Sequence, residues 1–133
     1  MIKQKDLKYF NIAKGASLLS DFKQKVGAVV VLDNEVIAVG YNRRKSHPLQ
    51  AHYALKAGRH QAIWLHAEMS CLVKLIDTEY KLTNAKIYVF RQLKKGQVSL
   101  AKPCEICELA LKTFGITQIA YTTLNGFNVS LIK

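Results

Sequence analysis

Two short segments of the chain carry side chains that could bind a metal ion. His66 lies in the segment His-Ala-Glu at residues 66–68, and Cys104 and Cys107 lie in the segment Pro-Cys-Glu-Ile-Cys at residues 103–107. Zinc binds imidazole nitrogen and thiolate sulfur tetrahedrally, and catalytic zinc sites use three protein ligands and leave the fourth position to water. One nitrogen and two sulfurs match that set. We therefore predict that His66, Cys104 and Cys107 hold one catalytic zinc ion (Zn2+).

The spacing within each segment restricts where it can lie on a helix. Cys104 and Cys107 are three residues apart, so both thiols would project from one face of a helix. If that helix starts at the cysteines, the positive end of its dipole would stabilise their thiolates. Residues two apart in the middle of a helix point about 200° away from each other. His66 and Glu68 can therefore share a pocket only if His66 lies at a helix start, as the apolar period beginning at Met69 indicates.

Glu68 is the predicted catalytic residue and proton shuttle. The combined pattern H-x-E followed by P-C-x-x-C is the one described for zinc-dependent nucleobase deaminases, in which the glutamate is not a zinc ligand. Zinc lowers the pKa of its water to about 7, Glu68 would accept the proton, and the hydroxide would attack the ring carbon that bears the amine. Glu68 would then pass the proton to the ring nitrogen and assist the loss of ammonia.

Each motif by itself has a simpler interpretation. A single C-x-x-C is often a structural zinc or redox motif, and H-x-E occurs by chance in many helices. A zinc module that binds a partner without catalysis is therefore an alternative, and it would not need Glu68. The odd number of cysteines does not suit a disulfide framework. The third of them, Cys71, is expected to be a small buried helix residue, since the ligand set is complete without it.

The rest of the chain supplies elements that could position the two motifs. Helical spacing predicts a first helix that Asp6 would cap and that reaches Leu19, and a second helix from His66 to Ile76. A third helix should start near Cys104 and end at Gly115. Residues 43–65 show no clear period, although Gln50–Lys56 could hold a short helix. Strands are expected at Val26–Leu32, Glu35–Tyr41, Lys86–Arg91, Gln118–Thr123 and Phe127–Ile132. This order predicts a mixed sheet with helices on its faces.

At these residues the chain resembles the cytidine deaminase superfamily, and within it the cytidine/deoxycytidylate-type zinc-binding deaminase domain, over roughly Val26 to Thr123. Residues 26–31 resemble the first strand of that family. Residues 40–42, Gly-Tyr-Asn, resemble the G-[YW]-N motif whose asparagine contacts the substrate sugar, which implies that role for Asn42. The alanine of the family's H-A-E motif offers backbone contacts to the base, which implies that role for Ala67. The length of 133 residues and the lack of a linker predict a single domain over residues 1–133. The element order and the resemblance imply a three-layer α/β/α sandwich with a mixed five-stranded sheet.

Two departures bear on the subfamily. The segment after Asn42 is longer and more basic than in tRNA adenosine deaminases. The chain ends with a turn at residues 124–126 and one strand, which suggests an antiparallel last strand as in free-nucleoside cytidine deaminases. Deoxycytidylate and tRNA-acting enzymes usually place a helix there. The Gly-Tyr-Asn motif and the tail therefore indicate different subfamilies, and both stay open at this point.

The net charge of +11 favours anionic partners, although charge kept for solubility is the simpler alternative. Acidic residues are absent from residues 36–67 and 80–104, and both of these basic stretches run into zinc ligands. We therefore expect positive charge at the pocket mouth, where it would attract phosphate, and Arg44 as a substrate contact. This favours a deoxycytidylate-like nucleotide, whose cytosine would become uracil, over a neutral nucleoside. A deaminase of single-stranded DNA or RNA is the alternative, with cytosine favoured over adenine by the resemblance.

Other side chains and the composition complete the expectations. His47, His52 and His60 lie in the first basic stretch and are more simply exposed loop histidines than ligands. The hydrophobic fraction of 50% and the charged fraction of 22% are typical of a soluble globular protein. No apolar run is long enough to span a bilayer, and the first residues lack the apolar stretch of a secretory signal. We expect a cytoplasmic protein without a membrane partner, and the resemblance allows a homo-oligomer.

Overall fold

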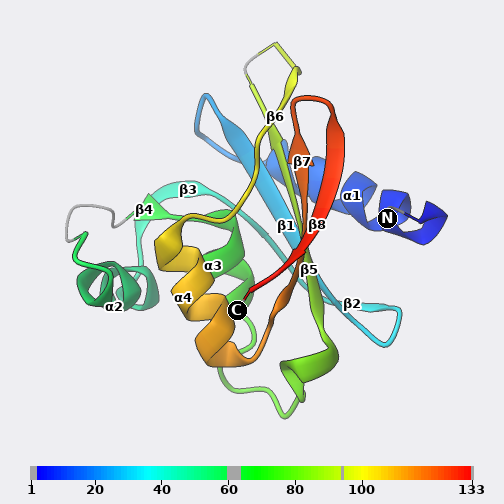
Figure 1. Cartoon of the computed structure of the whole chain (residues 1–133). Coiled ribbons are helices and arrows are strands. Elements are labelled where there is room, and N and C mark those ends of the chain that lie inside the picture. The colour runs from blue at the N-terminus through cyan, green and yellow to red at the C-terminus, as the bar shows by residue number, and fades with distance from the viewer. Residues whose placement is uncertain (1–2, 60–63, 94, 133) are drawn as a thin grey trace.

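The computed structural model describes residues 3–59, 64–93 and 95–132, and it is built around one mixed sheet (Figure 1). Five strands follow the order β2-β1-β5-β7-β8, and the short β6 pairs with β5. Their bounds are β1 Lys25–Leu32, β2 Glu35–Tyr41, β5 Lys86–Gln92, β6 Val98–Ser99, β7 Gln118–Thr123 and β8 Gly126–Leu131. All five predicted strands are present, nearly within the predicted bounds. The predicted five-stranded sheet is six-stranded, because the unpredicted β6 pairs with β5.

Strand directions follow from the connections. β1 and β2 form an antiparallel hairpin whose turn residues Asp33 and Asn34 have φ values of 52° and 65°, the left-handed conformation that two-residue hairpin turns require. β5 and β7 pair in parallel, which requires a crossover, and helix α4 (Glu105–Phe114) makes it. β8 returns antiparallel to β7 through a turn, so the expected direction of the last strand is confirmed.

Helices cover both faces of this sheet, as predicted for a three-layer α/β/α sandwich (Figure 1). On one face, α1 (Gln4–Ser17) buries Tyr9, Phe10 and Ala13 against β1 and β5. On the other face, α3 (Ala67–Val73) and α4 pack side by side over a larger apolar core. Alternate side chains of β1 enter each core, with Val29 facing α1 and Val30 facing α3 and α4, as the two-residue period of a doubly covered strand requires.

Residues 43–59 and 64–65 form a small unit beside α3. It contains β3 (Arg43–Ser46), α2 (Pro48–Lys56) and β4 (Trp64–Leu65), and β3 pairs with β4. The expected short helix is present and starts earlier than predicted, because His47 Nδ1 accepts a hydrogen bond from the Leu49 backbone N–H at 3.0 Å and Pro48 occupies the first turn. Residues 82–84 form a short 3₁₀ helix.

Three predicted helix boundaries, at both ends of the first helix and at the end of the second, were wrong. The first helix starts at Gln4 with Lys3 as N-cap, so Asp6 lies in the first turn and its carboxylate accepts from the Lys3 backbone N–H at 2.8 Å. The same helix ends before Leu19, which is exposed. Helix α3 ends at Val73, because the next residues continue in tighter turns with i to i+3 hydrogen bonds, and these turns carry Ile76 out to solvent.

No helix within the described residues is both long and apolar enough to cross a bilayer.

Asp6 joins α1 to the sheet through a buried charged network. Its carboxylate accepts hydrogen bonds from the Tyr88 hydroxyl and from Lys86 Nζ, the latter at 3.2 Å, and its side chain is 2% exposed. Burial alone would raise the pKa of Asp6, but the hydrogen bonds from Tyr88 and the Lys3 backbone and the Lys86 charge outweigh it, so the pKa is lowered from 3.8.

We predict that Asp6→Asn lowers the free energy of unfolding by about 1–2 kcal/mol at neutral pH, because a charged acceptor is lost. A lowered folded-state pKa gives stability that is complete above 3.8 and is lost as the pH falls through the folded value. The difference between variant and wild type should therefore shrink in acid. Urea unfolding at neutral pH and well below pH 3.8 measures it, and a difference that stays constant would contradict this account.

Gly40 in β2 lets the backbone of α3 lie directly on the sheet. A Cβ atom built at Gly40 would lie 2.7 Å from the Ala67 carbonyl oxygen and 2.8 Å from the Cys71 backbone nitrogen. We predict that Gly40→Ala destabilises the protein by about 1–3 kcal/mol, because α3 must move away. Gly15→Ala is the matched control. Gly15 lies in α1, and a Cβ atom added there would meet no atom within 4 Å, so alanine should stabilise by about 0.5–1 kcal/mol. Thermal unfolding compares the two, and equal effects would contradict the close approach.

Candidate active site

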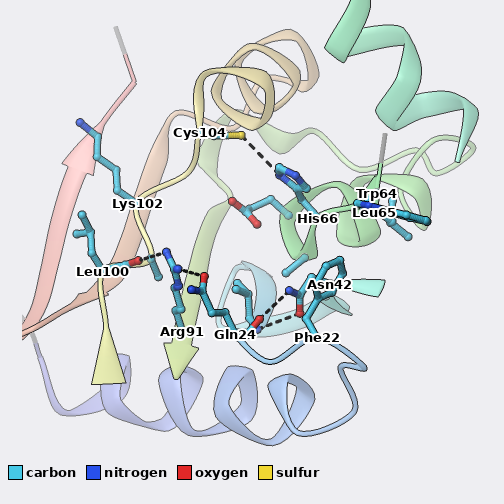
Figure 2. A pocket seen from close by; sticks show the side chains of 14 residues that line it. Phe22, Gln24, Asn42, Trp64, Leu65, His66, Arg91, Leu100, Lys102 and Cys104 are labelled. Carbon is cyan, nitrogen blue, oxygen red and sulfur yellow. Dashed lines mark hydrogen bonds between the residues drawn. The ribbon is translucent and has the colours of Figure 1, made fainter. Parts of the chain in front are cut away.

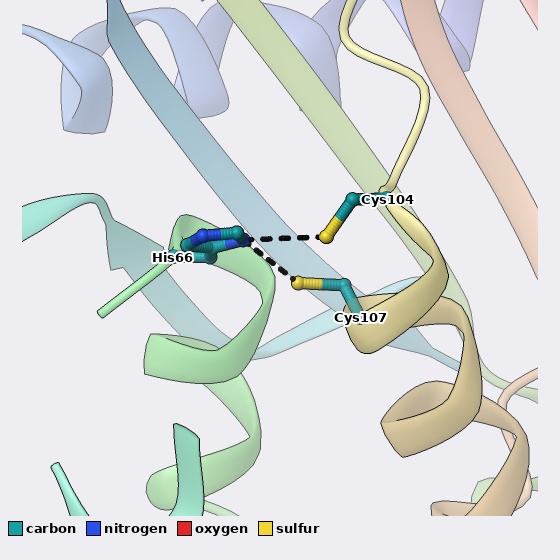
Figure 3. A group of neighbouring side chains, drawn as sticks. All are labelled: His66, Cys104 and Cys107. Carbon is teal, nitrogen blue, oxygen red and sulfur yellow. Dashed lines mark hydrogen bonds between the residues drawn. The ribbon is translucent and has the colours of Figure 1, made fainter. Parts of the chain in front are cut away.

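Three predicted zinc ligands meet between the starts of α3 and α4 (Figure 3). His66 Nδ1 lies 3.5 Å from Cys104 Sγ and 3.3 Å from Cys107 Sγ, and the ligand atoms of the three residues all lie within 4.8 Å of one another. One imidazole nitrogen and two sulfurs at this separation fit a zinc ion and leave room for a fourth ligand. The donor set is therefore the one that the sequence predicted.

Both ligand segments lie at helix N-termini. His66 is the N-cap of α3 and Cys104 is the N-cap of α4, each with extended backbone angles, and Cys107 follows in the first turn of α4. The prediction that His66 lies at a helix start is confirmed. Helix α2 holds the N-terminus of α3 in place, because the His66 backbone N–H donates a hydrogen bond to Gln50 Oε1 in α2 at 3.1 Å. The buried Gln50 amide is a supporting group that the sequence analysis missed.

The two thiols differ in acidity. A hydrogen bond from Cys107 lowers the pKa of Cys104 to about 3 against the opposing effect of burial, and the His66 ring lowers it further. The hydrogen bond to Cys104 and burial raise the pKa of Cys107. Zinc binds cysteine as thiolate, so zinc binding would remove the proton of the Cys107 thiol.

Glu68 lies in the first turn of α3, two residues after His66, and its side chain is 5% exposed. Burial raises the pKa of the Glu68 carboxyl above its ordinary value, although the His66 charge opposes this. Among the described residues that line the pocket, it is the only carboxylate. A carboxyl group whose pKa is raised is better suited to accept and return a proton than an ordinary carboxyl group.

A pocket of about 320 Å³ opens beside these residues (Figure 2). Its size is that of a small-molecule site. The lining contains His66, Cys104 and Glu68, and it contains Asn42 and Ala67, two of the three residues for which a substrate contact was predicted. The other lining residues are Phe22, Gln24, Val26, Trp64, Leu65, Arg91, Leu100, Ala101 and Lys102.

The predicted substrate contacts differ in their surroundings. Asn42 extends the hairpin by side-chain bonds: its Oδ1 accepts from the Val26 N–H and its Nδ2 donates to the Gln24 carbonyl, both at 3.0 Å. One Nδ2 hydrogen remains for a ligand. Arg44 does not line the pocket. Its guanidinium lies over the ring of Phe22, 5.1 Å from the ring centroid. Arg44 therefore packs against a residue that lines the pocket.

The second basic stretch contributes the cations of the pocket, and the first does not. Arg91 and Lys102 line the pocket, as expected for positive charge near the zinc ligands, whereas Arg43 packs on the Tyr41 ring. The sequence analysis missed Phe22 and Gln24, because they lie in an irregular segment between α1 and β1 that carries no motif. Trp64, two residues before His66, lines the pocket and is exposed, so it is not a core residue.

The cysteine and histidines not predicted as ligands have structural surroundings. Cys71 is fully buried, its thiol donates to the Ala28 carbonyl, and burial raises its pKa, as expected for a core residue. His47 caps α2, and His52 is exposed with its ring edge-on to Tyr53. His60 lies outside the described residues.

Comparisons with known proteins agree with this site. Residues 3–123 match the family model of the cytidine and deoxycytidylate deaminase zinc-binding region. A deoxycytidylate deaminase of Mycobacterium phage D29 is 30% identical over 127 residues, which cover 85% of this chain and 90% of that protein.

Solved structures share the fold. A cytidine deaminase from Burkholderia pseudomallei superposes with a TM-score of 0.68 at 19% identity, covering 98% of this chain and 94% of that one. The dCMP deaminase of cyanophage S-TIM5 gives a TM-score of 0.65 at 22% identity, covering 92% and 86%. The family match spans both ligand segments and the sheet between them. The chain therefore belongs to the cytidine and deoxycytidylate deaminase family and carries that family's zinc-binding region.

Proposed function

We propose that this deaminase hydrolyses the exocyclic amine of cytosine in a free, deoxycytidylate-like nucleotide and yields the uracil nucleotide and ammonia. The observation that carries the proposal is the convergence of His66, Cys104 and Cys107 next to the buried Glu68, in a pocket that also contains two cations. The 30% identity to a phage deoxycytidylate deaminase supports the choice of substrate.

Each site residue has a distinct task in this proposal. His66, Cys104 and Cys107 hold zinc, which when bound supplies a Lewis acid that makes water nucleophilic at neutral pH. Glu68 accepts a proton from the attacking water and delivers it to the ring nitrogen next to the carbon under attack. Glu68 then takes the proton of the newly added hydroxyl and passes it to the amine, so that the C–N bond breaks, ammonia leaves and the C=O bond of uracil forms. The raised pKa of the Glu68 carboxyl suits both transfers.

Ala67 and Asn42 orient the nucleotide. Ala67 is fully buried between His66 and Glu68, so its backbone presents fixed hydrogen-bonding groups to the base. The remaining Nδ2 hydrogen of Asn42 is available to a sugar hydroxyl, and the two backbone bonds hold the amide in place. Arg44, which packs behind Phe22, is proposed as an outer contact to phosphate.

A free nucleotide fits the charge distribution better than a strand does. A strand needs a continuous track of cations leading away from the pocket. Here Arg43 and Arg44 of the first basic stretch pack on aromatic rings, Arg59 pairs with Glu105, and the pocket lining itself holds Arg91 and Lys102. A cytoplasmic location and a homo-oligomeric state stay predictions.

A substrate panel tests the proposal. The zinc-loaded protein is incubated with dCMP, CMP, dCTP, deoxycytidine, adenosine monophosphate and cytosine-containing DNA and RNA oligonucleotides, and ammonia release and ultraviolet absorbance are followed. We expect turnover of dCMP above that of deoxycytidine and of the oligonucleotides. Turnover of none of the compounds, or of oligonucleotides alone, would overturn it.

We predict that Glu68→Gln lowers kcat for the best substrate by roughly 10²- to 10⁴-fold, because the amide keeps the shape but cannot carry the proton. Zinc content measured by atomic absorption should stay at one ion per chain, because Glu68 is not a ligand. If Glu68→Gln keeps full activity, Glu68 is not the proton shuttle and its catalytic assignment fails.

Cys107→Ser is the contrasting variant. Removing a buried sulfur ligand should lower zinc content together with activity, and excess zinc should restore little of either. A variant that keeps its zinc and its activity would show that Cys107 is not a ligand.

A further inference from the structure

We propose that Arg91 determines substrate specificity by binding the phosphate of the nucleotide, with Gln24 as its positioning residue. This deepens the proposed function and rests on it. Arg91 lies at the end of β5, and its side chain enters the pocket between the segment before β1 and the segment after β6 (Figure 2). The subsite is therefore formed by three stretches of chain other than the two zinc-ligand segments.

The Arg91 guanidinium is held by neutral acceptors. One Nη donates to the backbone carbonyl of Leu100 at 3.2 Å, and the other donates to the side-chain oxygen of Gln24. Nε has no hydrogen-bond partner. These contacts fix the orientation of the guanidinium group. Each Nη keeps one N–H that makes no hydrogen bond to Leu100 or Gln24.

The charge of Arg91 has no counter-ion within the described part of the chain. The two ion pairs found there join Arg59 to Glu105 and Lys86 to Asp6, and neither involves the pocket. A half-buried cation without a carboxylate loses hydration and gains no ion pair, so it attracts an anion. Guanidinium groups bind phosphate oxygens with two parallel hydrogen bonds. Lys102 adds a second positive charge to the same lining.

The short β6 makes this arrangement rigid. Ser99 pairs with Arg91, and the Thr122 hydroxyl accepts from the Arg91 backbone N–H at 3.1 Å and donates to the Ser99 carbonyl at 2.7 Å. The segment after Ser99 thereby brings the Leu100 carbonyl to the guanidinium. A cation fixed on both sides needs little reorganisation when a phosphate binds.

A purely structural role is the competing explanation, since Arg91 also ties two loops together. The position of Gln24 separates the two explanations. Gln24→Glu keeps the size and the acceptor and adds the missing negative charge. If Arg91 serves only to join the loops, this change should be neutral or favourable. If Arg91 receives phosphate, the new carboxylate competes with the substrate and repels it.

The experiment compares Arg91→Gln, Gln24→Glu and the control Lys95→Gln, which removes an exposed positive charge outside the pocket lining. For each zinc-loaded protein, kcat/KM is measured for dCMP and for deoxycytidine, and their ratio is taken. The ratio cancels any loss of folded enzyme. We expect Arg91→Gln and Gln24→Glu each to lower it by roughly 10- to 100-fold, as for a lost charge-assisted hydrogen bond, and Lys95→Gln to leave it unchanged. A ratio unaffected by either pocket variant would overturn the proposal.

A binding measurement separates this inference from the proposed function. The chain has one tryptophan, Trp64, and it lines the pocket, so its fluorescence can follow binding of dUMP and of deoxyuridine without turnover. Tighter binding of dUMP that is lost in Arg91→Gln supports the subsite even if dCMP is not a substrate. Equal affinity of the wild-type protein for the two compounds would overturn it even if dCMP is deaminated.

Discussion

The site depends on one parallel strand pair. Because β5 and β7 run in the same direction, the chain has to cross the face of the sheet between them, and α4 is that crossover. Its first residues consequently lie where β5 ends, and this brings Cys104 next to the start of α3. The backbone of α3 is fixed against β2 at Gly40, where no side chain intervenes. Two helix starts are thereby brought together, and the metal ligands need no loop of their own.

The same end of the sheet collects the other pocket residues. The segment before β1, the end of β2 and the end of β5 all terminate there, and they supply Gln24, Asn42 and Arg91. Open α/β sheets commonly bind ligands at strand ends near a change of strand order. The pocket contains a buried carboxyl and soft ligands in one part and a cation with neutral partners in another. This separation allows proton transfer and anion binding in one small volume.

The sequence contained most of this information where a rule links residue type to position. The ligand set, the helix start at His66 and the hairpin at Asp33 and Asn34 follow from spacing, dipole and turn chemistry, and each is present in the structure. Helix boundaries that depend on tertiary contacts were harder to predict from the sequence. Asp6 serves the sheet as well as its helix, so the N-cap prediction was wrong, and Ile76 lies beyond the end of the helix predicted to contain it.

The pocket wall was the least predictable part. Phe22 and Gln24 belong to no recognisable sequence motif. They line the pocket because the segment before β1, which is distant in sequence from the zinc ligands, lies at the same pocket in the fold. The basic stretch before Cys104 correctly indicated cations in the pocket, but which of them face it depends on strand register. Arg91 faces the pocket because of its place in β5, whereas Arg43 and Arg44 of the first stretch pack on aromatic rings.

The ligand arrangement also has a consequence for chain entropy. His66 and Cys104 are 38 positions apart, and the stretch between them contains α3 and the central strand β5. An ion bound to both residues acts as a cross-link that closes this long loop, and closing a long loop removes more freedom from the unfolded chain than closing a short one. Metal occupancy would thereby restrict the unfolded ensemble as well as equip the site for catalysis, so that one ion serves both the chemistry and the integrity of the sheet.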